Sequence, residues 1–241
     1  MVSDSQYEAS QLVRYEHDLK ETFNHYGFPL TERQVTQFNL YRTELLRWNE
    51  RINLTAITDD DEIVHKHFLD SLSVLEHISL RSGDSVVDIG TGAGFPGIVL
   101  KIYMPDIRLT LIESSKKKVS FLKFIVAQLN RHQSVNAHQS GDVKILAERA
   151  EICAQQQKHI GAYDWVFTRY VAPIRDSAAY CIPLLKLTGK WVAYKSGDET
   201  IENEISNSSA CLEALGGIVE TVLKNPKFNR NYVVIHRGNL Q

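Results

Sequence analysis

Two patterns of apolar residues divide this sequence near residue 80. Before that point, apolar residues recur every three or four positions, which predicts helices with one buried face. After it, short apolar runs alternate with helical segments, a pattern typical of a parallel sheet with crossover helices. We therefore expect an N-terminal helical cap over residues 1–80 and an α/β domain over residues 81–241.

The cap is expected to contain three helices. One covers residues 6–26, a second opens at a capping box formed by Thr31 and Gln34, and a third starts near Asp61. In the α/β domain a long polar loop, 131–142, precedes the third strand. Seven strands of a doubly wound, Rossmann-like sheet are predicted, at 85–89, 109–112, 143–147, 163–168, 189–195, 218–223 and 232–236.

The strongest local signal lies where the first strand meets its helix. Strand 85–89 runs into a turn with glycine at alternate positions, Gly90, Gly92 and Gly94, and Pro96 fits the first turn of the helix that follows. Glycines let the backbone turn tightly and leave no Cβ between the main chain and a ligand. This stretch therefore predicts a ligand site at the carboxyl end of the first strand.

Two cofactors compete for this turn because its residues satisfy two templates. Gly92–Gly97 matches the GxGxxG fingerprint of a dinucleotide site, which would indicate an NAD(P)-linked oxidoreductase. Asp88 and the alternate glycines match the acid–glycine pattern typical of S-adenosylmethionine sites. That cofactor has an ammonium and a sulfonium in place of a diphosphate, so an acid beside the glycines suits it, and Glu113 after the second strand can accept both ribose hydroxyls. We therefore favour S-adenosylmethionine.

Charge is distributed unevenly along the chain. Residues 1–85 contain 8 Lys+Arg and 15 Asp+Glu, a net charge of −7, whereas residues 86–241 contain 19 and 14, a net charge of +5. The part with the glycine turn is thus the basic part, which is compatible with a polyanionic substrate.

Composition also limits where the protein acts and what it binds. The sequence has no apolar run long enough to span a membrane, and its three cysteines form no CxxC pair. Residues 1–10 are polar and acidic, so we expect no signal peptide. His65 and His67 lie two residues apart on a helix and do not share a face, so no metal site is expected, and both, like Asp70, are interpreted as capping or core residues. We expect a cytoplasmic protein with reduced thiols.

Several segments together resemble one family. The run Asp88–Gly97 resembles that of the bacterial small-subunit (16S) ribosomal RNA methyltransferase G family, also called glucose-inhibited division protein B. Further segments are similar to the family's other motifs in order and spacing, and the match covers most of the chain: Trp48–Thr55, His67–Ser71, Arg149–Glu151, Thr168–Pro173, Tyr194–Gly197 and the closing Arg230.

The resemblance implies the seven-stranded S-adenosylmethionine methyltransferase version of the α/β fold, with the helical cap in front. It also implies a role in rRNA processing, in which a methyl group passes to N7 of one guanine of 16S ribosomal RNA to give 7-methylguanosine. The partner would be that RNA or the small ribosomal subunit, and no obligate protein partner is implied. By motif matching, the cofactor contacts would be Gly90, Phe95, Ala150, Glu151 and Arg169, beside Asp88, Gly92, Gly94 and Glu113.

Other residues have open roles. Arg169 can hold the methionine carboxylate or orient the guanine edge, and Arg51, Lys195 and Arg230 are candidate phosphate contacts. Tyr170 stands where the family has a small alanine, and we expect it to narrow the substrate mouth.

The loop at 131–142 looks longer than is usual in the family, so the third strand could begin earlier than residue 143, which would change the residues that contact the adenine. If the third strand lay earlier, Gly141-Asp142 would face the adenine instead of Ala150-Glu151.

The chemistry of a guanine N7 acceptor agrees with what the sequence lacks. Transferases acting on exocyclic amines carry an Asn/Asp-Pro-Pro-aromatic turn after the fourth strand, and here that place holds Thr168–Pro173. Pyrimidine C5 transferases need a cysteine nucleophile, often after proline, and Cys181 instead precedes Pro183. N7 already has a free lone pair, so its methylation needs in-line positioning and no general base. We therefore expect no acid–base catalyst.

Overall fold

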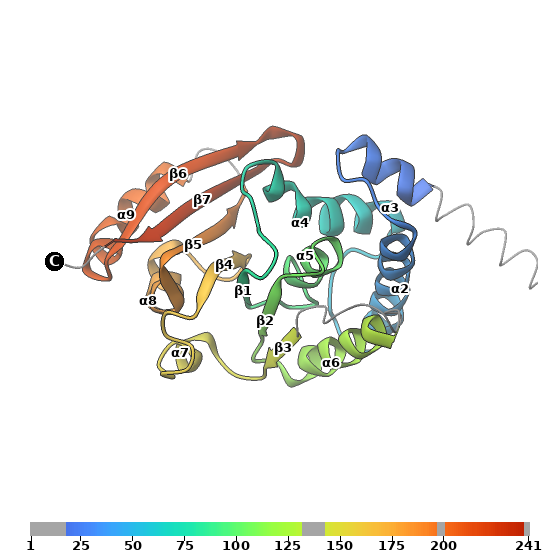
Figure 1. The fold of residues 1–241 in the computed structure, drawn as a ribbon, viewed down its shortest axis with the longest axis horizontal. Coiled ribbons are helices and arrows are strands. Elements are labelled where there is room, and N and C mark those ends of the chain that lie inside the picture. Colours follow the sequence, from blue (N-terminus) through green and yellow to red (C-terminus); the bar gives the residue numbers. More distant parts are fainter. Residues whose placement is uncertain (1–17, 132–142, 197–200, 239–241) are drawn as a thin grey trace, which may run out of the picture.

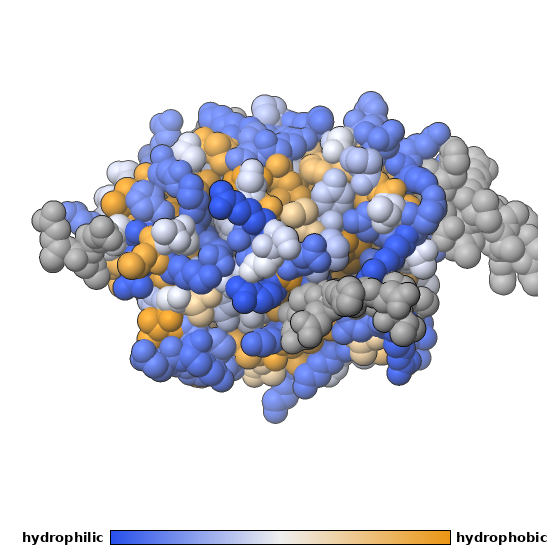
Figure 2. Space-filling view, viewed as in Figure 1, coloured by the Kyte–Doolittle hydropathy of each residue, from blue (hydrophilic) through white to orange (hydrophobic). Residues whose placement is uncertain are grey.

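The computed structural model describes residues 18–131, 143–196 and 201–238. At its centre lies a seven-stranded sheet with the order β3-β2-β1-β4-β5-β7-β6, with helices on both of its faces (Figure 1). Strands β1 to β5 pair in parallel, whereas β7 runs antiparallel to β5 and β6. Figure 2 shows the surface of the molecule from the same side as Figure 1: hydrophilic residues cover much of it, and hydrophobic residues are visible between them.

The strands agree closely with the predicted ones. They are β1 (Ser85–Ile89), β2 (Arg108–Ile112), β3 (Val143–Leu146), β4 (Tyr163–Arg169), β5 (Leu185–Lys195), β6 (Gly217–Asn225) and β7 (Arg230–Arg237). The helices of this part are α5 (Gly97–Tyr103), α6 (Lys116–Arg131), α7 (Ala150–Cys153), α8 (Ile174–Leu184), α9 (Ile201–Ala214) and the 3₁₀ turn η3 (Pro226–Phe228). Of the predicted loop, residue 131 ends α6 and the rest lies outside the described residues.

The cap contains helical residues 18–25, α2 (Glu32–Asn49) and one long irregular helix. The first helix is described only from residue 18 onward. The capping box predicted at Thr31 is present and opens α2. The irregular helix runs through α3 (Asp60–Ile63), the π-helical η1 (Val64–Leu69), α4 (Asp70–Leu72) and the 3₁₀ η2 (Ser73–Glu76). None of the described helices is long and apolar enough to cross a membrane.

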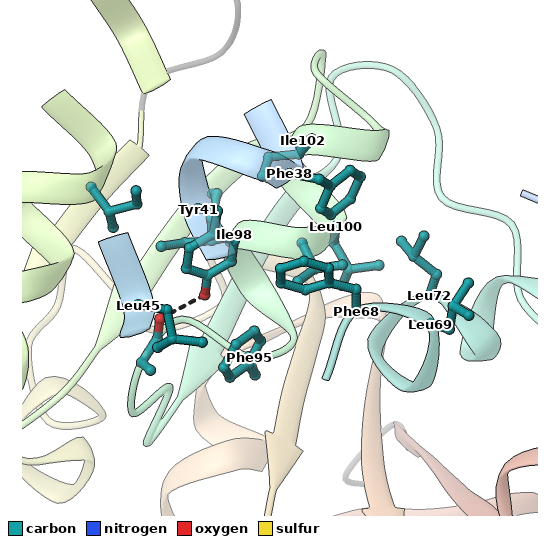
Figure 3. Packing of buried hydrophobic residues seen from close by; sticks show 14 of the residues in the cluster. Phe38, Tyr41, Leu45, Phe68, Leu69, Leu72, Phe95, Ile98, Leu100 and Ile102 are labelled. Carbon is teal, nitrogen blue, oxygen red and sulfur yellow. Dashed lines mark hydrogen bonds between the residues drawn. The ribbon is translucent and has the colours of Figure 1, made fainter. Parts of the chain in front are cut away.

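The cap and one face of the sheet share a single hydrophobic core. Tyr41 of α2 lies at its centre, with its ring 5.5 Å from that of Phe68 in η1 and 5.4 Å from that of Phe95 in the glycine turn (Figure 3). The Tyr41 hydroxyl donates a 2.6 Å hydrogen bond to the carbonyl oxygen of Ala93, and Tyr41 is 0% exposed. The cap is therefore attached to the turn in which the sequence predicts the ligand site.

We expect Tyr41→Phe to lower the free energy of unfolding by about 1–2 kcal/mol, because it leaves a buried carbonyl without its donor. Urea denaturation of the full chain measures this loss. Tyr103→Phe is the matched control, since the Tyr103 ring is half-buried and packs edge-on against Phe28 at the border of the cap. Equal losses in the two variants would contradict a special role for the Tyr41 hydroxyl.

Candidate active site

The glycine turn that follows β1 has a backbone that other residues rarely adopt. The φ angles of Gly90, Gly92 and Gly94 are +64°, +62° and +107°. A Cβ added at Gly94 would lie 2.5 Å from the Ile98 side chain, and one at Gly90 would lie 2.8 Å from that of Val171. The alternate glycines are therefore required by the shape of the turn. Pro96, expected in the first helical turn, is the N-cap of α5.

Five N–H groups of this turn are already donated within the protein. Those of Gly90 and Thr91 bond to the carbonyl of Ile112, and those of Gly94 and Phe95 bond to the carbonyl of Thr91. The N–H of Gly92 donates to Glu113 at 3.0 Å. A diphosphate needs free N–H donors at such a turn, so this arrangement argues against a dinucleotide.

Asp88, the acid before the glycines, is completely buried. Its Oδ2 accepts hydrogen bonds from the Thr91 hydroxyl at 2.5 Å and from the Gly97 N–H at 2.8 Å, while Oδ1 has no hydrogen-bond partner among the described residues. Burial raises the pKa of Asp88 to about 7, and these two hydrogen bonds lower it in part. Asp88 thus stabilises the turn through hydrogen bonds within the protein, which connect the end of β1 to the start of α5.

Glu113 follows β2 and is also fixed by the backbone. Its Oε2 accepts from the Gly92 N–H and its Oε1 accepts from the Ser115 N–H at 2.8 Å. Each carboxylate oxygen has a further lone pair, so the predicted ribose contact remains chemically available.

A cleft of about 120 Å³ opens beside the turn, at the carboxyl ends of β1, β2 and β4. It includes the predicted Gly90, Glu113, Ala150 and Glu151. Ala150 and Glu151 reach it because β3 pairs in parallel with β2, so that the chain leaving β3 passes the same edge of the sheet. The alternative residues Gly141 and Asp142 lie outside the described residues.

The charges on the cleft fit a cationic ligand. Glu113, Glu148 and Glu151 line it together with one basic residue, Arg149. Three carboxylates against one guanidinium make the cleft negative, which disfavours a diphosphate and is compatible with the net positive charge of S-adenosylmethionine. Glu148 was missed by sequence reasoning, although its place directly before the Arg149–Glu151 motif could have indicated it.

A buried ion-pair cluster lies on the other side of the turn. Asp70 of α4 is 2% exposed and accepts from two arginines: Arg169 at the end of β4, at 2.6 Å, and Arg230 at the start of β7, at 2.6 and 3.2 Å. The Arg169 guanidinium also lies 5.3 Å from the centre of the Phe95 ring. The cluster therefore connects the cap and two strands to the glycine turn.

His67 completes this cluster as a neutral imidazole. Burial, followed by the charge of Arg169, lowers the pKa of His67 to about 3. Since Arg169 can only donate, Nδ1 of His67 accepts from it at 3.3 Å, and Nε2 carries the proton and donates to the Thr55 hydroxyl at 2.8 Å. His67 and Asp70 are thus buried as predicted, but as members of a polar network and not as helix caps or apolar core.

The predicted phosphate contacts are not equally accessible. Arg51 is exposed. Lys195 is paired with Glu204 at 2.6 Å, and Arg230 is 9% exposed and paired with Asp70. Lys195 and Arg230 thus already have partners within the protein, and their contact with phosphate stays a prediction. Among the described residues, no group of three or more His, Cys, Asp or Glu side chains is arranged to hold a metal ion.

The sheet order, the acid-lined cleft and the turn with its occupied N–H groups are features of the class of S-adenosylmethionine-dependent methyltransferases. Solved structures share this fold: a SAM-dependent methyltransferase from Aquifex aeolicus (TM-score 0.52, 17% identity, covering 73% of this chain and 93% of that one) and a variant of MtNAS in complex with S-adenosylmethionine (TM-score 0.55, 13% identity, covering 84% and 75%). These structures confirm the fold class predicted from the sequence, and the family to which the chain belongs confirms the predicted cofactor in preference to the dinucleotide alternative.

The family model GidB, described as rRNA small subunit methyltransferase G, matches residues 34–232. The chain belongs to this family, as the motifs predicted. Two relatives named ribosomal RNA small subunit methyltransferase G are similar to it over most of their length. That of Alkaliphilus metalliredigens is 40% identical over 201 residues (83% of this chain, 80% of the relative), and that of a Roseiflexus species is 41% identical over 204 residues (83% and 81%).

We expect Asp88→Asn to change how stability depends on pH. The pKa of Asp88 is raised from 3.8 to about 7 in the folded protein, so the protonated acid stabilises the fold most below about pH 4, and this contribution is lost as the pH rises through 7. An asparagine keeps an acceptor oxygen and does not titrate. As the pH rises from about 5 to about 8, the urea concentration at the unfolding midpoint should therefore fall more steeply for the wild type than for the variant. Parallel curves would contradict the raised pKa.

We expect Asp70→Asn to destabilise the protein by about 3–5 kcal/mol, because it leaves two buried guanidinium groups without their counter-charge. The control is Asp164→Asn, which removes a more exposed acid that pairs with Lys186 at 2.7 Å. Urea denaturation should show a clearly smaller loss for the control. Similar losses would mean that the buried cluster does not depend on the Asp70 charge.

Proposed function

We propose that this protein transfers a methyl group from S-adenosylmethionine to N7 of one specific guanine of 16S ribosomal RNA, in the cytoplasm. The relatives named as small-subunit rRNA methyltransferases support the RNA class of the substrate. The net charge of +5 over residues 86–241, the part that carries the cofactor site, supports a polyanionic substrate.

In this proposal the cofactor occupies the acid-lined cleft. Gly90 permits close approach of the ligand to the backbone, Glu113 offers its remaining lone pairs to the ribose, and Ala150 and Glu151 face the adenine. The bound cofactor supplies an electrophilic methyl group on its sulfonium. The protein's part is then to place the acceptor nitrogen in line with that methyl group.

The observation that carries the N7 assignment is the absence of acceptor-activating groups at the end of β4. The segment that leaves β4 is Arg169-Tyr170-Val171, and Val171 lies on the cleft. It offers neither the Pro-Pro-aromatic turn used for exocyclic amines nor a thiol. Cys153 and Cys181 are 0% exposed, and burial raises the pKa of both thiols, to about 12 for Cys153. A ring nitrogen with a ready lone pair needs no such group.

Arg169 then acts as a fixed cation and not as a mobile clamp. Its two terminal nitrogens are engaged by Asp70 and His67, and its guanidinium lies over the Phe95 ring. We propose that this positive charge beside the turn orients either the methionine carboxylate or the O6/N7 edge of the guanine.

We expect 16S rRNA from a strain lacking this protein to gain one N7-methylguanosine when the wild-type gene is returned, and to gain little with Glu113→Ala, which removes the carboxylate that fixes Gly92. Mass spectrometry of nuclease digests measures the modification and its position. Methylation at another atom of the base would refute the N7 assignment, and unchanged RNA would refute the proposed reaction.

A further inference from the structure

A second hollow, which we call the aromatic groove, lies next to the cofactor cleft. Its volume is about 380 Å³, and Tyr170 lines it while the next residue, Val171, lines the cleft. Its lining residues come from the turn after the first helix, the irregular cap helix, the segment after β4 and the tip of the β6–β7 hairpin. The rings of Tyr26, after the first helix, and Phe228, at the hairpin tip, lie 5.4 Å apart. Figure 1 shows this hairpin tip beside the first helix. Its lining includes Tyr26, His65, Lys66, Tyr170, Lys227 and Phe228.

Aromatic rings form much of this groove. Besides the contact with Phe228, the Tyr26 ring lies 5.5 Å from that of His65, edge to face. Tyr170 is 69% exposed with a φ of +55°, and it lies over the Arg230 guanidinium at 4.8 Å. An exposed ring at this position is a surface on which an unpaired base can stack.

The charges of the groove are predominantly positive. Lys66, Lys227 and Arg230 line it, and the one carboxylate among its lining residues, Asp70, is already shared by two arginines. Lys66 pairs with Glu62 at 2.5 Å, and Lys227 is 3.7 Å from Glu76. Both lysines are exposed, and exposed pairs of this kind exchange for a phosphate at little cost.

We propose that the aromatic groove binds the single-stranded RNA segment next to the methylated guanine, with backbone phosphates at Lys66 and Lys227 and an unpaired base on Tyr170. This inference rests on the proposed function, because it takes the RNA substrate from there. Stacking surfaces combined with cations are the chemistry of single-strand recognition, whereas a double helix would hide its base faces from Tyr170.

The test uses the full chain and a fluorescent single-stranded RNA of about twelve nucleotides, read by anisotropy at several salt concentrations. The variant Lys66→Glu/Lys227→Glu should bind this RNA about tenfold more weakly, with a salt slope lower by about 0.7 for each phosphate that the variant no longer binds. Tyr170→Ala should weaken binding about fivefold with little change in slope. Binding of S-adenosylhomocysteine, measured by calorimetry, should stay unchanged in these variants and so shows that they are folded.

The matched control is Lys186→Glu/Lys190→Glu. These lysines also pair with carboxylates at the surface, with Asp164 and Glu220, but they lie near the amino end of β4, at the opposite edge of the sheet. RNA binding should be nearly unchanged in this control. If the control lost as much RNA affinity as the groove variant, the overall charge of the protein would explain the loss, and the proposal would be overturned.

Two other results would overturn the inference. One is unchanged RNA affinity in the groove variants; the other is a loss seen with assembled small subunits but not with free RNA, which would indicate a ribosomal protein as the occupant. The proposed reaction is judged separately, by N7-methylguanosine in 16S rRNA treated with the wild type. Its absence together with intact groove-dependent RNA binding would refute the reaction, and with it the place of the RNA segment beside a methylated guanine, while the groove would stand as an RNA-binding site.

Discussion

The Asp70 carboxylate between two arginines is the interaction on which the arrangement of the site depends. A buried ion loses its hydration and is stable only when its partners are well placed, so Asp70, Arg169 and Arg230 must be positioned together. They come from the cap, from β4 and from β7, which makes this small cluster the point where three distant parts of the chain meet. Because Arg169 also contacts Phe95, the same interaction reaches the cofactor turn.

The cap is therefore part of the site and not only a cover for the sheet. Tyr41 bonds to the turn, Phe68 packs in the same core, and His67 contacts both Phe95 and Arg169. The change of sequence pattern near residue 80 marks a change in the type of element, while the hydrophobic core passes across it. The cleft and the aromatic groove lie next to each other at the end of β4, where Tyr170 lines the groove and Val171 lines the cleft.

Local signals in the sequence were sufficient for much of the fold. Strand β1 was predicted at its observed residues, because an apolar run followed by glycines is informative without knowledge of the rest of the chain. Gly90, Glu113, Ala150 and Glu151 were expected at the cofactor site and do meet at one cleft. The ion-pair cluster could not be predicted in this way, since its partners are 99 and 160 residues apart. Its formation depends on the strand order and on the π-helical segment before Asp70, neither of which leaves a local pattern.

The antiparallel final strand has a consequence for how the chain reaches its native state. Because β7 runs opposite to its neighbour β5, its first residue, Arg230, arrives at the edge of the sheet where β4 ends. During synthesis on the ribosome, Asp70 and Arg169 emerge well before Arg230, so the cluster can be completed only when nearly all of the chain is available. Contacts between residues so distant in sequence slow folding. The ion-pair cluster is thus completed late, and its last component, Arg230, belongs to the hairpin that also borders the aromatic groove.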